Sequence, residues 1–395
     1  MNSKDSSARG RLNVAIVGAG FMGRAHSNAW RQAPKFFDLP LDVSMAVLCR
    51  ADSARAQEAA ELLGWESSES DWRNLLTRDD VDLIDICVPG ALHADIAVAA
   101  LNAGKHVLCE KPLANTVEQA EAMAEAAQRA AARGVQSMVG FSYRRAPAIA
   151  LARRMVVEGK IGRIQQIRAG YRQDFIVDPN EPLSWRLEKD KAGSGALGDI
   201  GAHLIDLCQY LADDTITEVS GTLETFVKRR PLAAPGSGLG GRQAAEGYGD
   251  VTVDDAAWFL GRMSQGTVAS FEATRFATGR KNELTIEVSG SAGALRWNLE
   301  DYNVLEYYDG SEPAVESGFR RILATEPDTP YYHAWWPTGH VIGWEHGFTH
   351  QVVDLVNAIA SGESPRPTFA EGLSVQRVLA AVERSAASRA SWTDV

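Results

Sequence analysis

Cysteine is scarce in this chain of 395 residues: it has four, Cys49, Cys87, Cys109 and Cys208. No two of them form a C-x-x-C pair, so the sequence indicates neither a zinc knuckle nor a redox dithiol. Three of them lie inside runs rich in β-branched residues, which predicts small, buried side chains. We expect no bound metal ion.

The sequence also lacks long apolar runs and an excess of positive charge. No apolar run approaches the ~20 residues needed to span a bilayer. The first residues, MNSKDSSARGR, lack the apolar core of a secretory signal. Lys and Arg number 40 against 51 Asp and Glu, a formal net charge of −11, whereas affinity for nucleic acid comes largely from clustered cations. We therefore expect a cytoplasmic protein without a nucleic-acid or membrane partner.

The first part of the chain alternates strands with helices. After a tail over residues 1–12, expected to be disordered, apolar strands are predicted at residues 13–17, 43–49, 83–88, 106–109 and 135–141. Their near-continuous apolar character is typical of parallel strands covered on both faces. The pattern predicts an α/β domain over residues 13–142.

The second part, residues 143–395, has a different pattern. A helix at 148–158 is followed by strands of period two, predicted at 164–173, 217–227, 256–263, 266–274, 283–289, 294–298 and 303–308. We expect an irregular loop at 230–249, a packed aromatic loop at 327–344, and closing helices at 345–360 and 371–387. This predicts an α+β domain with a large, mostly antiparallel sheet that is open on one face. An exposed apolar face would associate, so we expect a homo-oligomer, a dimer or tetramer.

A glycine turn follows the first predicted strand. Gly18, Gly20 and Gly23 form G-x-G-x-x-G between this strand and a helix, with Phe21 and Met22 inside the motif. The first glycine permits the tight turn, the second lets the backbone approach a pyrophosphate, and the third lets helix and strand pack closely. The turn therefore predicts a dinucleotide-binding Rossmann domain.

The end of the second strand bears on the choice of cofactor. An acidic residue there binds the ribose 2′-hydroxyl of NAD, and an Arg accommodates the 2′-phosphate of NADP. Arg50 favours the phosphate or stacks on the adenine, whereas Asp52 would repel a phosphate if it faces the same pocket. We favour NAD(H) and keep NADP(H) open.

Two later motifs carry a family resemblance. They are Glu110-Lys111-Pro112 and Gly198-Asp199-x-x-x-His203, and they accompany Val88-Pro89-Gly90-x-x-His93. With the glycine turn, they make the chain resemble the glucose–fructose oxidoreductase / inositol dehydrogenase / rhizopine-catabolism (Gfo/Idh/MocA) family from about residue 13 to the C-terminus. Gln173-Asp174, Trp185-Arg186 and Glu272-x-x-Arg275 are similar to its levoglucosan dehydrogenase branch, which would carry an acidic residue where this chain has Arg50.

The chemistry of alcohol oxidation fits three of these residues. Hydride loss from a secondary alcohol needs removal of the hydroxyl proton, and a cation near the oxygen stabilises the developing alkoxide. Lys111 follows a parallel strand, at the edge where such sheets bind ligands. Asp199 and His203 are spaced i, i+4, so a carboxylate can orient an imidazole suited to acid–base work. The resemblance implies that Lys111, Asp199 and His203 form the catalytic set.

The resemblance implies further contacts on each side of the reaction. On the cofactor side it adds Val88, Pro89, His93, Glu110 and Lys111 to the glycine turn and Arg50. On the side of a sugar, glycoside or cyclitol substrate, the candidates are Tyr143, Arg172, Asp174, Trp185, Arg186, His203 and Arg275. Packing or capping is an alternative interpretation of His93 and Tyr143.

The resemblance implies an NAD(P)-dependent sugar or cyclitol dehydrogenase, but other functions stay open. The same groups could serve a redox-neutral, NAD-dependent glycoside hydrolase that oxidises its substrate transiently. Several basic residues would suit an anionic sugar such as a sulfosugar. A non-catalytic nucleotide sensor is less favoured, because Lys111, Asp199 and His203 are all present.

Overall fold

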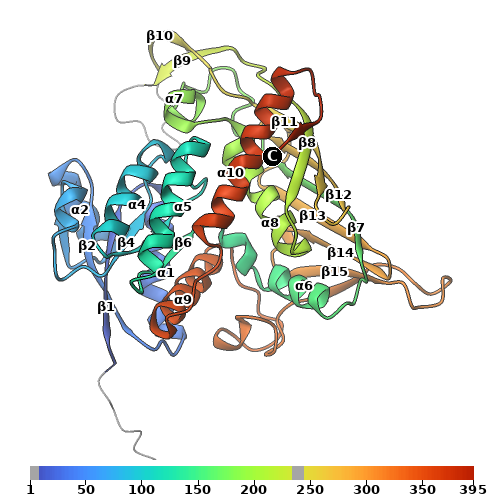
Figure 1. Ribbon diagram of the computed structural model, residues 1–395, viewed down its shortest axis with the longest axis horizontal. Helices are drawn as coiled ribbons and strands as arrows, with labels where there is room; N and C mark the ends of the chain where they lie inside the picture. The colour runs from blue at the N-terminus through green and yellow to red at the C-terminus, as the bar shows by residue number, and fades with distance from the viewer. Residues whose placement is uncertain (1–8, 234–243) are drawn as a thin grey trace, which may run out of the picture. The chain divides into compact units, whose positions relative to one another are not determined.

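The computed structural model describes residues 9–233 and 244–395, which form two compact units (Figure 1). The first unit comprises Met1–Leu113, Glu121–Ser142 and Glu345–Ala370. The second comprises Ala114–Ala120, Tyr143–Trp344 and Glu371–Val395. One segment of the first unit ends at Ser142, where the division was predicted, and each unit also takes one segment from the other side of that boundary. Within the described residues, no helix is both long and apolar enough to cross a membrane.

The first unit contains a parallel sheet, which in the described residues has six strands in the order β3-β2-β1-β4-β5-β6. The strands are β1 (Arg11–Val17), β2 (Asp42–Cys49), β3 (Ser67–Glu69), β4 (Leu83–Ile86), β5 (His106–Cys109) and β6 (Ser137–Val139). The helices are α1 (Phe21–Phe36), α2 (Ser53–Leu63), α3 (Trp72–Leu75), α4 (His93–Asn102), most of α5 (Val117–Ala131) and α9 (His346–Ser361). The predicted α/β domain is confirmed.

Two details of the first unit differ from the sequence expectation. Strand β1 starts at Arg11 and pairs with β2 from Arg11 opposite Asp42, so residues 11 and 12 belong to the sheet. Residues 1–8 of the predicted tail lie outside the described part. Helix α9 packs beside α1, where the ring of Phe348 lies 5.4 Å from that of His26. This packing explains why a segment so late in the chain belongs to the first unit.

The second unit contains the large sheet, in which the described residues form nine strands in the order β16-β15-β14-β13-β7-β12-β11-β8-β17. The strands are β7 (Ile164–Arg172), β8 (Ile216–Glu224), β11 (Ala256–Met263), β12 (Val268–Thr274), β13 (Glu283–Gly290), β14 (Gly293–Asn298), β15 (Val304–Asp309), β16 (Arg320–Leu323) and β17 (Thr393–Asp394). Only β7 and β12 pair in parallel among these strands. The predicted, mostly antiparallel sheet is confirmed.

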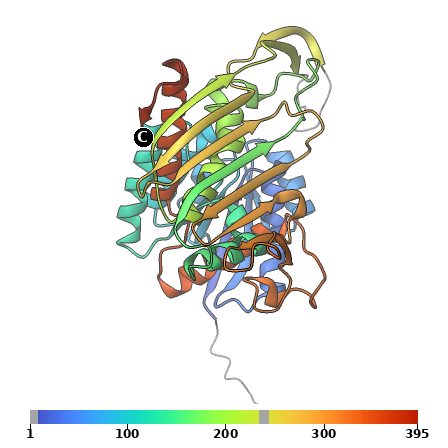
Figure 2. The same ribbon diagram turned by 90° about the vertical axis from the view of Figure 1, so that its right-hand side faces the viewer.

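Helices lie on one face of the large sheet and leave the other open, as Figure 2 shows for the face turned to the viewer. This unit contains α6 (Pro147–Val157), α7 (Lys189–Ala192), α8 (Ala202–Ala212) and most of α10 (Phe369–Ala387), and α8 packs on β7. The open face is less apolar than expected. Trp258, Leu260 and Val268 are exposed on β11 and β12, but charged pairs such as Arg168–Glu287 lie on the neighbouring strands.

The segment 230–249, predicted to be irregular, carries secondary structure. Strands β9 (Arg229–Ala233) and β10 (Ala244–Asp250) pair antiparallel as a two-stranded sheet within the described residues. The fully buried guanidinium of Arg230 donates to the carbonyls of Asp178 and Ile176, which fixes β9. Residues 234–243 lie outside the described part. The prediction for 327–344 is confirmed, since Tyr332 is buried in a short 3₁₀ turn there.

Candidate active site

The glycine turn has the shape that a dinucleotide needs. Gly18 has φ +107°, and a Cβ at this position would lie 2.5 Å from the carbonyl oxygen of Cys87. A Cβ on Gly23 would lie 2.1 Å from the carbonyl oxygen of Gly18. Both positions therefore require glycine for the turn itself to form.

Gly20 differs from its two neighbours in the motif. A Cβ built on Gly20 would meet no atom of the described chain within 4 Å, so the turn does not need glycine here. Gly20 is the N-cap of α1 and offers no side-chain cap, and the first turn of α1 carries no acidic residue. A helix N-terminus attracts an anion through its backbone N–H groups and the helix dipole. The free space beside Gly20 at this helix start fits a pyrophosphate.

Arg50 and Asp52 follow β2 and bear on the choice of cofactor, and their side chains have different surroundings. The carboxylate of Asp52 caps α2 by accepting the backbone N–H of Arg55 at 3.0 Å, and it lies 3.7 Å from the Arg55 guanidinium. Arg50 is half-buried, and its backbone N–H donates to Glu69. Asp52 therefore serves as a helix cap, and a contact of Arg50 with the 2′ position stays a prediction.

We expect Arg50→Asp to change the ratio of the NADP and NAD dissociation constants by about tenfold or more in favour of NAD, since a hydrogen bond to a charged group is worth ~1.5–3 kcal/mol. Titrating wild type and variant with both reduced cofactors measures this ratio. An unchanged ratio would mean that Arg50 does not contact the 2′ position.

The segment around Lys111 is held by backbone contacts. The Lys111–Pro112 peptide bond is cis. The imidazole of His93 lies 3.0 Å from the carbonyl of Pro112 and 2.8 Å from that of Val88, and it is buried. Burial lowers the pKa of His93, whereas the two carbonyls that its ring nitrogens face raise it. His93 therefore joins the Val88–Pro89 turn to the turn after Lys111, and its side chain faces backbone rather than the surface.

Glu110 needs a correction. It was predicted on the cofactor side, but its carboxylate is buried and lies 2.9 Å from Nε2 of His26, inside the first unit. The remaining cofactor-side candidates lie at the strand ends: Phe21 and Pro89 are exposed, and Met22 and Val88 are half-buried.

In the second unit, Asp199 and His203 lie on consecutive turns of one helical segment. Asp199 belongs to a π-helical turn, Leu197–Gly201, that runs directly into α8 with His203 near its start. Such turns recur at functional sites because they widen the helix locally. The carboxylate of Asp254 holds the segment by accepting the backbone N–H groups of Gly195 and Leu197 at 2.8 and 2.7 Å.

Two tyrosines lie against His203. The ring of Tyr143 is 4.4 Å from the imidazole, and that of Tyr171 is 6.1 Å away. Their hydroxyls are 2.9 Å apart, and Tyr171 donates to Asn282 at 2.7 Å. Tyr143 was predicted here. Tyr171 was missed, although alternation along β7 would have identified it once the inward face of the strand was known.

The alternation of side chains along β7 also corrects the prediction for Arg172. Its guanidinium lies on the open face of the sheet, where it donates to Glu272 at 2.6 Å and to Glu283 at 3.2 Å. Successive side chains of a strand point to opposite faces, so Tyr171 faces His203 and Arg172 faces away. Asp174 also departs from its predicted substrate role, because it accepts the backbone N–H of Gly279 and the ammonium of Lys281 at 3.0 and 2.7 Å and anchors a loop.

Arg275, also predicted on the substrate side, lies next to Asp199. It was predicted to contact substrate, but its side chain is 0% exposed. It donates to the carbonyl of Asp254 at 3.0 Å, and its guanidinium lies 3.8 Å from the carboxylate of Asp199. Arg275 therefore places a buried positive charge beside the Asp199 carboxylate.

Trp185 and Arg186 form a stacked pair in a short 3₁₀ turn. The guanidinium carbon of Arg186 lies 4.3 Å from the centre of the Trp185 ring, so one face of the indole is covered. Burial lowers the pKa of Arg186, and the nearby charge of Asp199 opposes that effect. Asp199 thus lies in the field of two guanidinium groups, Arg186 and Arg275.

Comparison with known proteins places these features in a family. A sequence profile of an oxidoreductase family with an NAD-binding Rossmann fold (GFO/IDH/MocA) matches residues 12–141, and the profile of the C-terminal domain of that family matches residues 149–296. Levoglucosan dehydrogenase of Pseudarthrobacter phenanthrenivorans is 43% identical over 388 residues, which cover 97% of this chain and 98% of the relative.

Solved structures agree over the same length. An oxidoreductase domain protein from Kribbella flavida superposes with a TM-score of 0.93 at 60% identity, covering 98% of this chain and 99% of the other. A levoglucosan dehydrogenase in complex with NADH and levoglucosan superposes with a TM-score of 0.91 at 42% identity, with the same coverage.

Proposed function

Since this chain belongs to the Gfo/Idh/MocA family of NAD-binding oxidoreductases, we propose that it transfers hydride between NAD(H) and a secondary hydroxyl of a pyranose, with levoglucosan or a related anhydrosugar as the substrate. The observation that carries this proposal is the full-length similarity to levoglucosan dehydrogenase, whose complex with NADH and levoglucosan has the same fold. The turn at Gly18–Gly23 would hold the cofactor pyrophosphate.

Each side chain of the site has its own role in the proposed reaction. The bound nicotinamide supplies the hydride acceptor. The ammonium of Lys111 stabilises negative charge on the substrate oxygen, and His203 accepts the hydroxyl proton. Asp199, one helical turn before His203, orients the imidazole. Tyr143 and Tyr171 hold the imidazole plane through the ring contacts and the hydrogen bonds described above.

Arg275 tests this arrangement, because it is a buried cation next to Asp199. We expect Arg275→Met to lower kcat by about tenfold, a loss of ~1.4 kcal/mol of transition-state stabilisation. Arg275→Lys should lose less, because it keeps the charge. Steady-state kinetics of both variants, with urea unfolding as a check on stability, measures the effect. Equal kcat values in the two variants would contradict a role for the charge.

The hydrolase hypothesis is not retained, because the relatives reported above are an oxidoreductase and dehydrogenases. One measurement distinguishes a dehydrogenase from a redox-neutral hydrolase. A dehydrogenase forms one NADH for each sugar oxidised, whereas a redox-neutral hydrolase forms none in net. We expect NADH to appear in a one-to-one ratio with oxidised levoglucosan. Sugar consumption without NADH formation would overturn the proposal, and no turnover of any anhydrosugar would exclude this substrate class.

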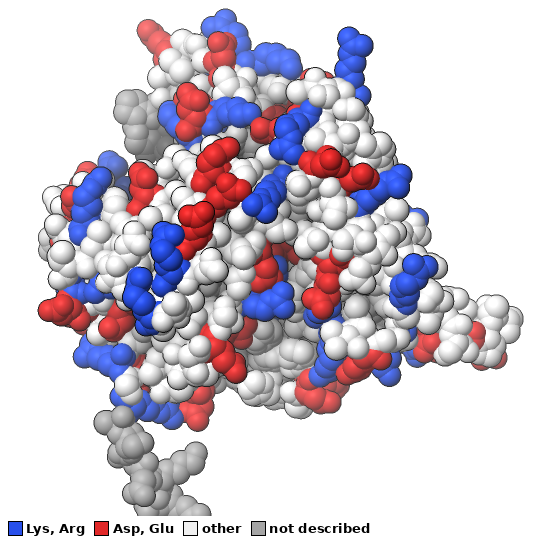
Figure 3. All heavy atoms as spheres, in the orientation of Figure 1, with Lys and Arg blue, Asp and Glu red and all other residues white. Residues whose placement is uncertain are grey.

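We also propose that the open face of the large sheet pairs with a second copy of this chain in the cytoplasm. Trp258, Leu260 and Val268 are exposed on adjacent strands, and rows of opposite charge flank them. A surface that combines apolar side chains with both signs of charge is suited to self-association. Figure 3, which views the molecule from a different side than Figure 2, shows acidic and basic side chains interspersed on that side. The four free thiols, three of them buried, suit a reducing compartment.

We expect light scattering of the wild type at micromolar concentration to give a dimer or a larger oligomer. Leu260→Glu combined with Val268→Glu should give a smaller species, because both charges would be buried in the contact. A monomeric wild type would contradict the proposed pairing.

A further inference from the structure

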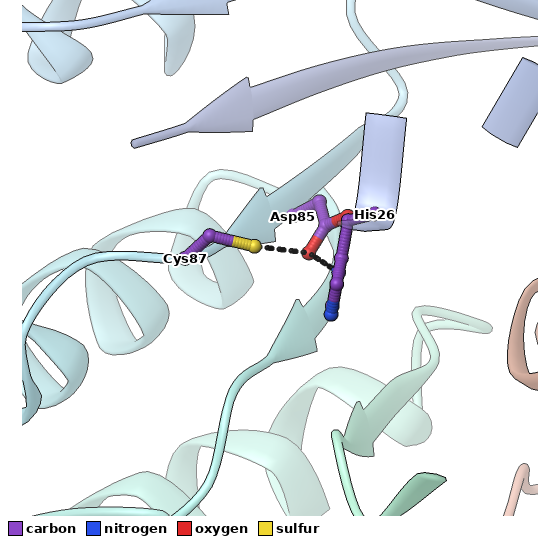
Figure 4. Close-up of side chains that lie close together, drawn as sticks. All are labelled: His26, Asp85 and Cys87. Atoms are coloured by element: carbon purple, nitrogen blue, oxygen red, sulfur yellow. Dashed lines mark hydrogen bonds and ion pairs between the residues drawn. The ribbon is translucent and has the colours of Figure 1, made fainter. Parts of the chain in front are cut away.

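A buried charged cluster lies inside the first unit, beneath the glycine turn. It consists of His26 on α1, Asp85 on β4 and Glu110 just after β5, with Cys87 and Trp30 around Asp85. The exposed fractions of His26, Asp85 and Glu110 are 1%, 0% and 4%. Figure 4 shows Asp85 between His26 and Cys87. Burying a charge lowers the stability of the folded protein unless the charge is paired. A buried cluster of charges is therefore a candidate for a functional role.

His26 joins the two carboxylates. Its Nδ1 lies 2.9 and 3.0 Å from the two oxygens of Asp85, and its Nε2 lies 2.9 Å from Oε1 of Glu110. His26, Asp85 and Cys87 are close enough together to suggest a metal site. However, both imidazole nitrogens already face carboxylates at hydrogen-bond distance, which leaves no lone pair for an ion. The distances fit an imidazolium that donates one proton to each carboxylate.

The surroundings support this protonation state. Burial by itself lowers the pKa of His26, but Asp85 raises it, and the net result is a pKa well above the usual value. The indole of Trp30 also donates to Asp85 at 2.7 Å, and the ring of Phe348 covers His26 at 5.4 Å. Burial raises the pKa of the Cys87 and Cys109 thiols, so both stay uncharged. The charged groups facing one another are thus one cation and two carboxylates.

Glu110 connects this cluster to Lys111. Its other oxygen, Oε2, accepts the backbone N–H of Lys111 at 3.2 Å. Gly140 on the adjacent chain segment makes room for this carboxylate, because a Cβ there would lie 2.7 Å from Oε1 of Glu110. One carboxylate therefore contacts His26 on one side and the amide at the start of the Lys111–Pro112 turn on the other.

We propose that His26 is a positioning residue for Lys111: it holds the Glu110 carboxylate against the Lys111 backbone amide, so that the ammonium of Lys111 is presented in one orientation. This proposal rests on the role of Lys111 in the proposed function. In His26→Gln, the neutral amide can donate to one carboxylate only. Two carboxylates then remain together in a dry site, where one of them takes up a proton.

The effect on turnover has a characteristic pH dependence. We expect His26→Gln to lower kcat roughly 10–100-fold at pH 7, the range for a lost hydrogen bond to a charged group, with the NADH dissociation constant nearly unchanged. The deficit should shrink as pH rises, because Glu110 regains its charge. The double variant His26→Gln/Asp85→Asn should recover part of the activity at pH 7, since it removes the competing carboxylate.

A merely structural histidine predicts the opposite pattern. The losses of the two substitutions would then add, and the ratio of variant to wild-type kcat would not change with pH. Either result would overturn the proposal. His106→Gln is the matched control: it replaces another histidine of the first unit, on β5 and upstream of Glu110, and should leave kcat and its pH profile as in wild type.

A second measurement separates this proposal from the sugar specificity. ¹⁵N spectra of the histidine side chains should show both nitrogens of His26 protonated at pH 8, assigned by their loss in His26→Gln. A neutral His26 ring would overturn the proposal whatever the substrate. If the ring is protonated but no sugar is oxidised by wild type, the proposed function fails and the charged cluster stands.

Discussion

Replacing His203 by alanine should lower kcat on the sugar substrate by about 10²–10⁴-fold, the usual cost of removing a positioned acid–base group. The imidazole lies at the start of α8 and packs against the rings of Tyr143 and Tyr171. Lys111→Ala should lose a similar factor, because it removes the cation for the reacting oxygen. Asp199→Asn should fall between wild type and His203→Ala, since the imidazole stays but the carboxylate one helical turn before it loses its charge.

Three readouts distinguish this role from packing. The NADH dissociation constant should change little in His203→Ala, because the glycine turn belongs to the other unit. The ionisation near neutrality in the pH–rate profile of wild type should disappear. His350→Ala removes another fully buried imidazole, one that packs edge-on against Phe37, and should keep kcat. Near wild-type turnover in His203→Ala would assign His203 to packing alone.

Replacing Gly20 by valine should weaken NADH binding by about 100-fold or more while the protein remains folded. The fold tolerates a side chain here, since its Cβ would meet no described atom within 4 Å and φ is −74°. The pyrophosphate would lose its approach to the backbone N–H groups, and charge-assisted hydrogen bonds of this kind are worth ~1.5–3 kcal/mol each. Calorimetric titration with NADH measures the loss.

Gly23→Ala is the contrasting variant within the same motif. Its Cβ would lie 2.1 Å from the carbonyl oxygen of Gly18, so helix α1 must move away from β1. We expect it to lower the free energy of unfolding by ~1–3 kcal/mol, the cost of overpacking. Urea denaturation of both variants tests the contrast. If Gly20→Val binds NADH as wild type does, the pyrophosphate does not lie at this turn.

Local patterns in the sequence were sufficient for the fold class and for the order of the motifs. The glycine turn, the apolar parallel strands and the period-two strands each involve neighbouring residues, and the structure reproduces them. The common helical segment of Asp199 and His203 could be predicted for the same reason, since their spacing is i, i+4. The family resemblance in the sequence likewise agrees with the comparisons.

The tertiary structure alone decided which way several side chains point. A strand pattern does not say which face is inward, so Arg172 was predicted at the site in place of Tyr171, and only the packing of α8 on β7 distinguishes them. Glu110 and Arg275 look like exposed charges in the sequence, yet each is buried against a partner far along the chain, His26 and Asp199. Helix α9 belongs to the first unit because its apolar face packs on α1, some 310 residues earlier. Contacts between residues distant in sequence depend on how the elements pair in space, and no local pattern of residues specifies that pairing.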